Sequence, residues 1–227
     1  MLEKLKEAVC RANIELKENG LVLFTWGNVS AIDRESGLIV IKPSGVKYEN
    51  MQPGDMVVVD ADGKIIEGSL RPSTDLATHL ELYRAHPCIG GVVHTHSTYA
   101  TAFAQSCRPI PIYGTTHADY FHGDIPCARV LRAEETDDYE RNTGVAINEI
   151  LTDAAGIPAC LVSHHGVFAW GKDADEAVYN ATVTEEVAKM AFLTEHMTDS
   201  PEKLPCHITD KHYERKHGIS AYYGQVF

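Results

Sequence analysis

The sequence predicts one α/β domain in which a central, mainly antiparallel β-sheet is sandwiched between helical layers. Three pairs of β-rich runs are each separated by a short turn signal, which is the pattern of antiparallel hairpins. Segments with helical spacing of apolar residues alternate with these hairpins, so helices are expected on both faces of the sheet. No repeat, low-complexity tract or Pro/Ser-rich linker interrupts residues 1–227, which we therefore interpret as a single domain.

The N-terminal half predicts one helix, two hairpins and a second helix. Residues 2–18 carry apolar side chains at helical spacing, and Gly20 follows as a stop signal. The runs LVLFTWGNVSAID and LIVIKP around DRESG predict the first hairpin, and MVVVD with KIIEG around ADG predicts the second. Residues 73–85 predict a helix, because S-T-D can cap its start and apolar residues follow on one face.

The C-terminal half predicts a buried strand, a third hairpin and four helices. IGGVVH is the strand, and TYATAFAQ after it predicts a helix, whereas residues 115–124 lack any period and predict a loop. Residues 139–155 predict a helix, and ACLVS with VFAWG predicts a hairpin around HHG. The longest helical pattern covers residues 173–197, and a last helix is expected near 208–217. A stripe of small residues should pack the long helix on the core: Ala177, Ala181, Thr184, Ala188 and Ala191.

Composition favours a small-molecule substrate over a polymer or a membrane surface. The formal charge is −12, the pI is near 5.4 and no basic patch is evident, which argues against nucleic acid and membranes as partners. No apolar run approaches the ~20 residues that span a bilayer. The N-terminus MLEKLKEAVC is charged rather than signal-like, and the six cysteines show no C-x-x-C spacing. A cytoplasmic protein with free thiols is expected.

Histidines at the ends of two predicted strands are the first candidate site. His94 and His96 are two residues apart, so both side chains project from one face of a strand. A second pair, His164-His165, ends another apolar run, and Asp75 opens a predicted helix. Three imidazoles and a carboxylate are typical of a catalytic zinc site. Taken alone, the H-T-H sequence is better explained by exposed histidines at a strand end.

Three turn segments are candidates for binding a phosphate group. KPSG (Lys42–Gly45) follows a strand, RPSTD (Arg71–Asp75) opens a helix, and WGNVS (Trp26–Ser30) breaks a β-rich run. Backbone amides, hydroxyls and a helix N-terminus at such points can bind an anion. Each segment taken alone is better explained as an ordinary turn or cap. Their presence in one chain favours a site without showing that they converge.

Two further segments could supply proton carriers. Asp119 lies in the irregular run TTHADYFHGD, where it could act as an acid or base or could simply cap a turn. The C-terminal AYYGQ places two tyrosines, including Tyr223, in a tail that nothing obvious covers. Exposed terminal aromatics are either frayed or docked on a neighbouring subunit, and docking would bring a phenol to another chain's site.

These motifs together resemble the L-ribulose-5-phosphate 4-epimerases of the class II aldolase family. The likeness extends from FTWGNVSAIDRESGLIVIKPSG through RPSTD, GGVVHTHSTYATAFAQ, GTTHADYFHGDIPC and HHGVFAWGKDADEAV to KHYERKHG and AYYGQ. It implies zinc as cofactor and a homotetramer with active sites between subunits. The positions that match the family's site are as follows: metal ligands Asp75, His94, His96 and His165; substrate-binding Gly27, Asn28, Lys42, Ser44, Gly45, Ser73 and Thr74; acid/base Asp119 and Tyr223, the tyrosine coming from the next subunit, with His212 and Arg215 as further cross-subunit contributors.

The activity that the resemblance implies is the interconversion of L-ribulose 5-phosphate and D-xylulose 5-phosphate by retro-aldol cleavage of C3–C4 and re-addition. Epimerases of arabinose and of ascorbate breakdown share these motifs. Two departures are present: Thr74 stands where the family has a second serine, and His164 precedes the expected ligand His165. A class II aldolase such as L-fuculose-phosphate aldolase is the nearest alternative, although those relatives place a glutamate at the position of Asp75. A non-catalytic scaffold of the same fold, which would have little reason to keep the three histidines, is the other.

Overall fold

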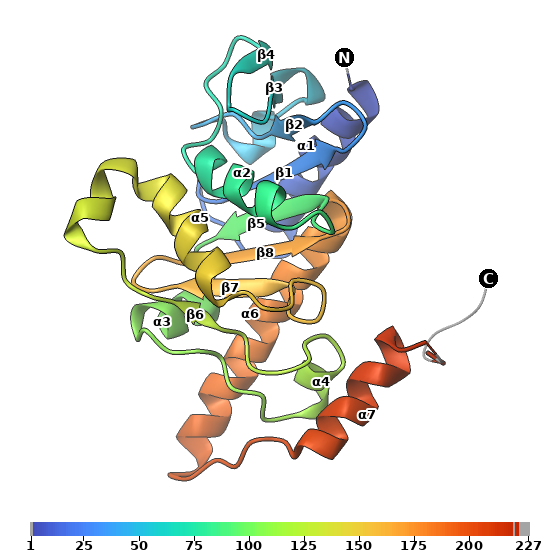
Figure 1. Cartoon of the computed structure of the whole chain (residues 1–227), viewed down its shortest axis with the longest axis vertical. Helices are drawn as coiled ribbons and strands as arrows, with labels where there is room; N and C mark the ends of the chain where they lie inside the picture. The colour runs from blue at the N-terminus through green and yellow to red at the C-terminus, as the bar shows by residue number, and fades with distance from the viewer. Residues whose placement is uncertain (1, 220, 223–227) are drawn as a thin grey trace.

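The computed structural model describes residues 2–219, 221 and 222, so Tyr223, Val226 and Phe227 lie outside the described residues. Eight strands form one sheet (Figure 1). They are β1 (Asn28–Asp33), β2 (Leu38–Ile41), β3 (Val57–Val59), β4 (Ile65–Glu67), β5 (Gly91–Thr95), β6 (Cys127–Ala128), β7 (Ala159–Val162) and β8 (Val167–Gly171).

The strand order across the sheet is β4-β3-β2-β1-β5-β8-β7-β6. Every neighbouring pair is antiparallel except β6 and β7, which run parallel. The three predicted hairpins are β1–β2, β3–β4 and β7–β8, and β5 joins the first hairpin to the third. The prediction of a mainly antiparallel central sheet is therefore confirmed.

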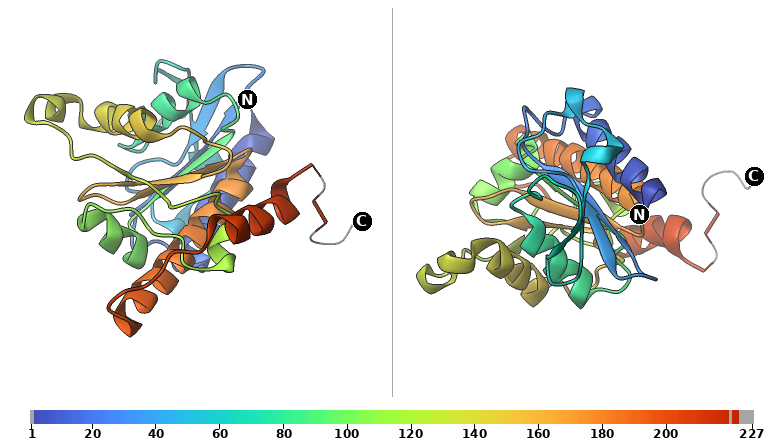
Figure 2. Two further views of the ribbon diagram at one scale, coloured as in Figure 1. Left: turned by 60° about the horizontal axis from the view of Figure 1, so that its bottom comes forward. Right: turned by 90° about the horizontal axis from the view of Figure 1, so that it is seen from above.

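Helices cover both faces of the sheet, as predicted (Figures 1 and 2). One core layer packs α1, α3 and α6 against the sheet, and the other packs α2 and α5 against the opposite face. The long helix α6 buries the whole predicted stripe of small residues, so its backbone can approach the strands closely. The helices are α1 (Glu3–Glu18), α2 (Leu76–Ala85), α3 (Thr98–Gln105), α4 (Thr115–Ala118), α5 (Tyr139–Ile150), α6 (Ala174–Met197) and α7 (Cys206–His217).

The predicted first strand begins later than its β-rich sequence indicates. Residues 21–27 form a loop, and β1 starts only at Asn28. Gly27 has a φ of +76°, and a Cβ there would lie 2.7 Å from the carbonyl oxygen of His94. Only glycine allows this close approach. The chain therefore bends at Gly27, and the residues before it lie outside the sheet. The bend places residues 25–27 beside the end of β5.

Other elements also differ from the prediction. The expected loop 115–124 contains one helical turn, α4, and the helix expected over 139–155 ends at Ile150. The two-residue strand β6 was not predicted, because two residues carry no periodicity and their pairing with β7 is a tertiary contact. Within the described ranges, no helix is both long and apolar enough to cross a membrane.

Candidate active site

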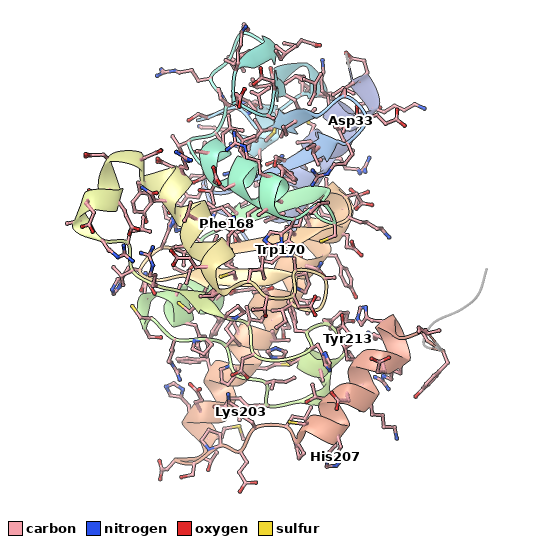
Figure 3. All side chains as sticks on the ribbon, in the orientation of Figure 1. Asp33, Phe168, Trp170, Lys203, His207 and Tyr213 are labelled. Carbon is pink, nitrogen blue, oxygen red and sulfur yellow. The ribbon has the colours of Figure 1, made fainter. Side chains whose placement is uncertain are left out.

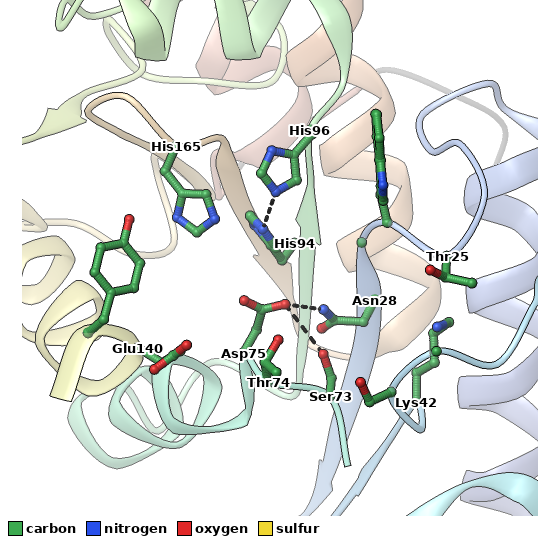
Figure 4. Close-up of a pocket in the computed structure, with 15 residues that line it drawn as sticks. Thr25, Asn28, Lys42, Ser73, Thr74, Asp75, His94, His96, Glu140 and His165 are labelled. Atoms are coloured by element: carbon green, nitrogen blue, oxygen red, sulfur yellow. Dashed lines mark hydrogen bonds between the residues drawn. The ribbon is translucent and has the colours of Figure 1, made fainter. Parts of the chain in front are cut away.

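Three histidines from two neighbouring strands converge (Figure 4). His94 lies near the end of β5, His96 follows two residues later, and His165 lies in the turn between β7 and β8. One ligand atom from each ring lies within 4.8 Å of the other two. The Nε2 atoms of His94 and His96 are 3.1 Å apart. The antiparallel pairing of β5 with β8 explains this convergence, because it sets the β7–β8 turn beside the end of β5.

The sequence H-H-G allows the turn to come this close. His165 donates its backbone N–H to Val162, and Val162 donates to Gly166, which closes a tight hairpin. A Cβ on Gly166 would lie 2.6 Å from the carbonyl oxygen of Thr95. Glycine is therefore required next to His165, and the turn brings that imidazole rather than its neighbour into the cluster.

The three imidazoles fit a zinc ion. Nitrogen ligands about 2.0–2.1 Å from a tetrahedral zinc are separated by about 3.3–3.4 Å, close to the observed distance between His94 and His96. His94 Nδ1 lies 3.0 Å from the carbonyl oxygen of Val167, to which it can donate, leaving Nε2 with a free lone pair. His165 Nδ1 is buried and has no hydrogen-bond partner among the described residues. The converging ring nitrogens of the three histidines could therefore share one bound cation.

Burial keeps two of the three imidazoles in the protonation state that metal binding needs. It lowers the pKa of His165 to about 4, and the imidazoles of His94 and His96 act in the same direction. Burial also lowers the pKa of His96, again with His94 contributing. Neutral imidazoles are the form that coordinates metal, so these two ligands are ready at neutral pH.

Asp75 occupies the N-cap position of α2 beside the cluster, but its side chain makes no capping hydrogen bond to the helix and is held by other partners. Its Oδ2 accepts hydrogen bonds from Asn28 Nδ2 at 2.6 Å and from Ser73 Oγ at 3.3 Å. Burial alone would raise the pKa of Asp75, but the neighbouring imidazoles and the Asn28 hydrogen bond together hold it below its ordinary value. The carboxylate thus links the histidines to the turn segments, although the cluster of converging ligand atoms consists of the three histidines.

The three turn segments converge on the same pocket, which has a volume of about 620 Å³. The loops that contain Ser44 and Ser73 run side by side, because Ser44 donates to Arg71 and Ser73 donates to Lys42 through the backbone. Arg71, which could have supplied charge, does not line the pocket. The lining includes all of the predicted substrate-binding and metal positions: Gly27, Asn28, Lys42, Ser44, Gly45, Ser73, Thr74, Asp75, His94, His96 and His165.

Lys42 places a positive charge beside the turn segments of the pocket. Only 2% of the residue is exposed, and Nζ lies 5.1 Å from the centre of the Tyr48 ring. Burial lowers the pKa of Lys42 to about 8, and the negative charge of Asp75 opposes that shift. The amine is therefore mostly protonated at neutral pH and suited to attract an anion.

Two residues opposite the turn segments were not predicted. Tyr139 and Glu140, the first two residues of α5, line the pocket. Figure 4 labels Glu140 on the side of Asp75 away from Asn28. The Tyr139 ring lies 5.8 Å from the ring of His165. Sequence spacing could not have predicted that Tyr139 lies near the strand-end histidines. Its position depends on a tertiary contact, the packing of α5 against α2.

Asp119 lies elsewhere in this chain. It follows α4 directly and does not line the described histidine pocket. In Figure 1, α4 and α7 lie at the lower right, whereas α5, which does contribute to the pocket, lies at the left. Its carboxylate accepts hydrogen bonds from His212 Nδ1 at 3.0 Å and from Arg215 Nε and Nη2 at 2.9 and 2.6 Å. Within one chain, Asp119 therefore lies apart from the pocket that the histidines line. His212 and Arg215 contact Asp119 within one chain.

The start of α3, two residues after His96, is held by a carboxylate from another helix. Glu185 on α6 accepts the backbone N–H groups of Tyr99 and Ala100, each at 2.9 Å. Glu185→Ala should lower the free energy of unfolding by about 1–2 kcal/mol, because these donors lose a charged cap. Urea denaturation measures the change. Glu186→Ala, at the adjacent exposed position, is the charge-matched control, and an equal loss there would contradict the capping role.

Comparison with known proteins shows the family of the chain. Residues 7–192 match the sequence model of the family described as Class II Aldolase and Adducin N-terminal domain. The chain belongs to this family. It is similar to a solved L-fuculose 1-phosphate aldolase, with 28% identity, a TM-score of 0.81 and coverage of 93% of this chain and 95% of that one.

Two further class II aldolase-like structures match over nearly their whole length. YgbL from Escherichia coli, titled a putative aldolase/epimerase/decarboxylase, shares 26% identity with a TM-score of 0.73, covering 92% of this chain and 97% of that chain. L-fuculose-1-phosphate aldolase from Thermus thermophilus shares 25% identity with a TM-score of 0.70, covering 88% and 100%. The predicted fold class is thus confirmed, and the histidine triad could hold the divalent metal, typically zinc, that this family generally uses.

Proposed function

We propose that the protein is a zinc-dependent 4-epimerase that interconverts L-ribulose 5-phosphate and D-xylulose 5-phosphate. The observation that carries the proposal is the pocket, which joins a three-imidazole cluster to three turn segments whose amides and hydroxyls could bind an anion. A sugar phosphate needs both features, because its phosphate must be held while its carbon chain lies over the metal ligands. A scaffold domain would have no use for a converging histidine cluster.

In this proposal, the turn segments bind the phosphate and the histidines bind the metal. The amides and hydroxyls of the turns, with Asn28 and Lys42, would bind the phosphate and retain the two-carbon aldehyde after C3–C4 cleavage. His94, His96 and His165 would hold zinc, which supplies Lewis-acid stabilisation of the negative charge that cleavage generates. Inversion then requires the retained aldehyde to turn before the bond re-forms.

Two proton carriers complete the proposal, and both would come from a neighbouring copy. Asp119 and Tyr223 match the acid/base pair, and the position of Asp119 beside α7 favours its acting on another chain's pocket. Burial would raise the pKa of Asp119, but Arg215 and His212 hold it below its ordinary range. An ionised carboxylate can accept the C4 hydroxyl proton. A homotetramer with sites between subunits satisfies this arrangement.

Asp75 is the feature that favours epimerisation over release of the products. The side chain is one methylene shorter than the glutamate of the aldolases, and Asn28 and Ser73 hold it toward the turns. We infer that it orients these groups rather than carrying the proton. L-fuculose-phosphate aldolase activity remains the second candidate, supported by the similarity to two solved structures that bear that name.

A coupled assay distinguishes these functions. Purified protein is given L-ribulose 5-phosphate, and D-xylulose 5-phosphate is measured with and without chelator; L-fuculose 1-phosphate is tested in parallel for release of a three-carbon ketose phosphate. Chelator-sensitive formation of D-xylulose 5-phosphate supports the epimerase. Turnover of L-fuculose 1-phosphate alone would replace it with the aldolase, and no turnover of either would exclude both.

The pKa of Lys42 predicts how activity changes with pH. Above pH 8 the free enzyme loses the ammonium charge, whereas the substrate phosphate, with a second pKa of about 6, stays dianionic. The ratio kcat/KM should therefore fall as pH rises through about 8, mainly through a higher KM. In Lys42→Met the ratio should be lower at neutral pH and lack this fall. An unchanged alkaline limb in the variant would remove Lys42 from phosphate binding.

A further inference from the structure

An aromatic side chain lies flat against one of the metal-site histidines. Phe168 on β8 is the register partner of His94 on β5, and both are fully buried on the face of the sheet that packs against α2. Their rings are stacked, with centroids 4.3 Å apart and planes inclined by 19°. Because His94 Nδ1 is already directed at Val167, the stack fixes the remaining freedom, which is rotation of the ring plane.

A second histidine, outside the triad, packs against the same aromatic ring. His79 on α2 stands edge-on to Phe168, with centroids 5.9 Å apart and planes at 78°. It is fully buried, and its Nδ1 lies 2.7 Å from Ser30 Oγ, which lies 2.7 Å from Tyr83 Oη. These short contacts anchor a polar ring next to the buried apolar side chains of this layer. The proposed reaction assigns His79 no role in binding metal or substrate, and His79 does not line the pocket.

We propose that Phe168, buttressed by His79, is a positioning residue that holds the His94 imidazole with Nε2 toward the metal. The column runs Tyr83–Ser30–His79–Phe168–His94 and joins α2 to β1, β8 and β5. A ligand that is already oriented loses no ring rotation when metal binds, so affinity rises. The inference rests on the proposed metal site, but not on which sugar phosphate is the substrate.

A matched core variant separates positioning from packing. Trp170 lies two residues along β8 on the same face, in the same buried layer as Phe168 (Figure 3), but pairs with Val92 instead of His94. Phe168→Leu and Trp170→Leu each remove an aromatic ring from that layer, so both should lower Tm. Only the change at Phe168 should alter zinc affinity, because, of the two residues, only Phe168 contacts a metal-site histidine.

The experiment measures zinc affinity of the metal-free proteins by competition with a chromophoric chelator, with Tm recorded for each. Phe168→Leu should raise the zinc Kd by about 10–100-fold, the usual range for residues behind a metal ligand, and Trp170→Leu by less than about threefold. Phe168→Tyr, which keeps the stacked ring, should stay close to the wild type. Equal effects of the two leucine variants, or unchanged affinity in Phe168→Leu, would overturn the proposal.

Substitution of His79 tests the buttress. His79→Asn keeps a polar group near Ser30 but removes the ring edge, and its zinc Kd should rise by about 3–10-fold, less than for Phe168→Leu. His79→Phe keeps the edge and should stay closer to the wild type, and the reverse order would assign the effect to the Ser30 contact. If Phe168→Leu does not fold, Phe168→Met replaces it. Wild-type zinc binding without epimerisation would reject the proposed function while leaving this inference intact.

Discussion

His165→Asn is expected to abolish turnover and metal binding together. Losing one of three ligands removes the Lewis acid, whose stabilisation of about 4 kcal/mol or more corresponds to a loss of at least about a thousandfold in kcat. Metal content, measured by elemental analysis, should fall from about one ion per chain to well below that value. Chelation of the wild type should have the same effect, and zinc should restore it.

The adjacent histidine provides a control within the same turn. His164 is exposed and has a φ of +61°, a region that asparagine tolerates better than most residues. Its side chain lies 3.2 Å from Cys107 Sγ rather than in the histidine cluster. His164→Asn should therefore keep both zinc and activity. Loss of zinc in this variant but not in His165→Asn would reverse the assignment of the ligand.

Asp119→Asn should slow epimerisation by about 10²–10⁴-fold, the usual contribution of a general acid or base, while metal content stays unchanged. The amide keeps the shape of the side chain but cannot accept the proton. Asp210→Asn is the control. Asp210 lies on α7 and contacts His122 at 2.8 Å, so this change also removes a carboxylate that ties α7 to the rest of the chain, but it leaves Asp119 intact. Comparable rates in Asp119→Asn and wild type would remove Asp119 from the mechanism.

Mixing two inactive chains then tests where Asp119 acts. In a random equal mixture of His165→Asn and Asp119→Asn chains, roughly a quarter of the sites between subunits would combine two intact halves. Activity should recover to about that fraction of the wild type. Verified mixed oligomers without recovery would mean that the histidines and Asp119 of one chain serve the same site.

Local sequence patterns predicted most of the fold. The hairpins around DRESG, ADG and HHG formed as expected, because each combines alternating or β-branched runs with residues that favour turns. The stripe on α6 predicted its buried face, since helical spacing fixes which side chains share a side. The start of β1 was wrong, because the close approach of Gly27 to His94 joins residues far apart in sequence.

The kinds of residue in the pocket can be read from local sequence patterns: strand-end histidines, hydroxyl- and glycine-containing turns, and a carboxylate at a helix start. That these groups meet follows from the tertiary structure, because the order β1-β5-β8 brings Asn28, His94 and the His165 turn to one end of the sheet. It also separated Asp119 from that pocket and set Phe168 against His94. Spacing along a chain specifies the face of one element, whereas distances between elements depend on how the sheet pairs and how the helices pack on it.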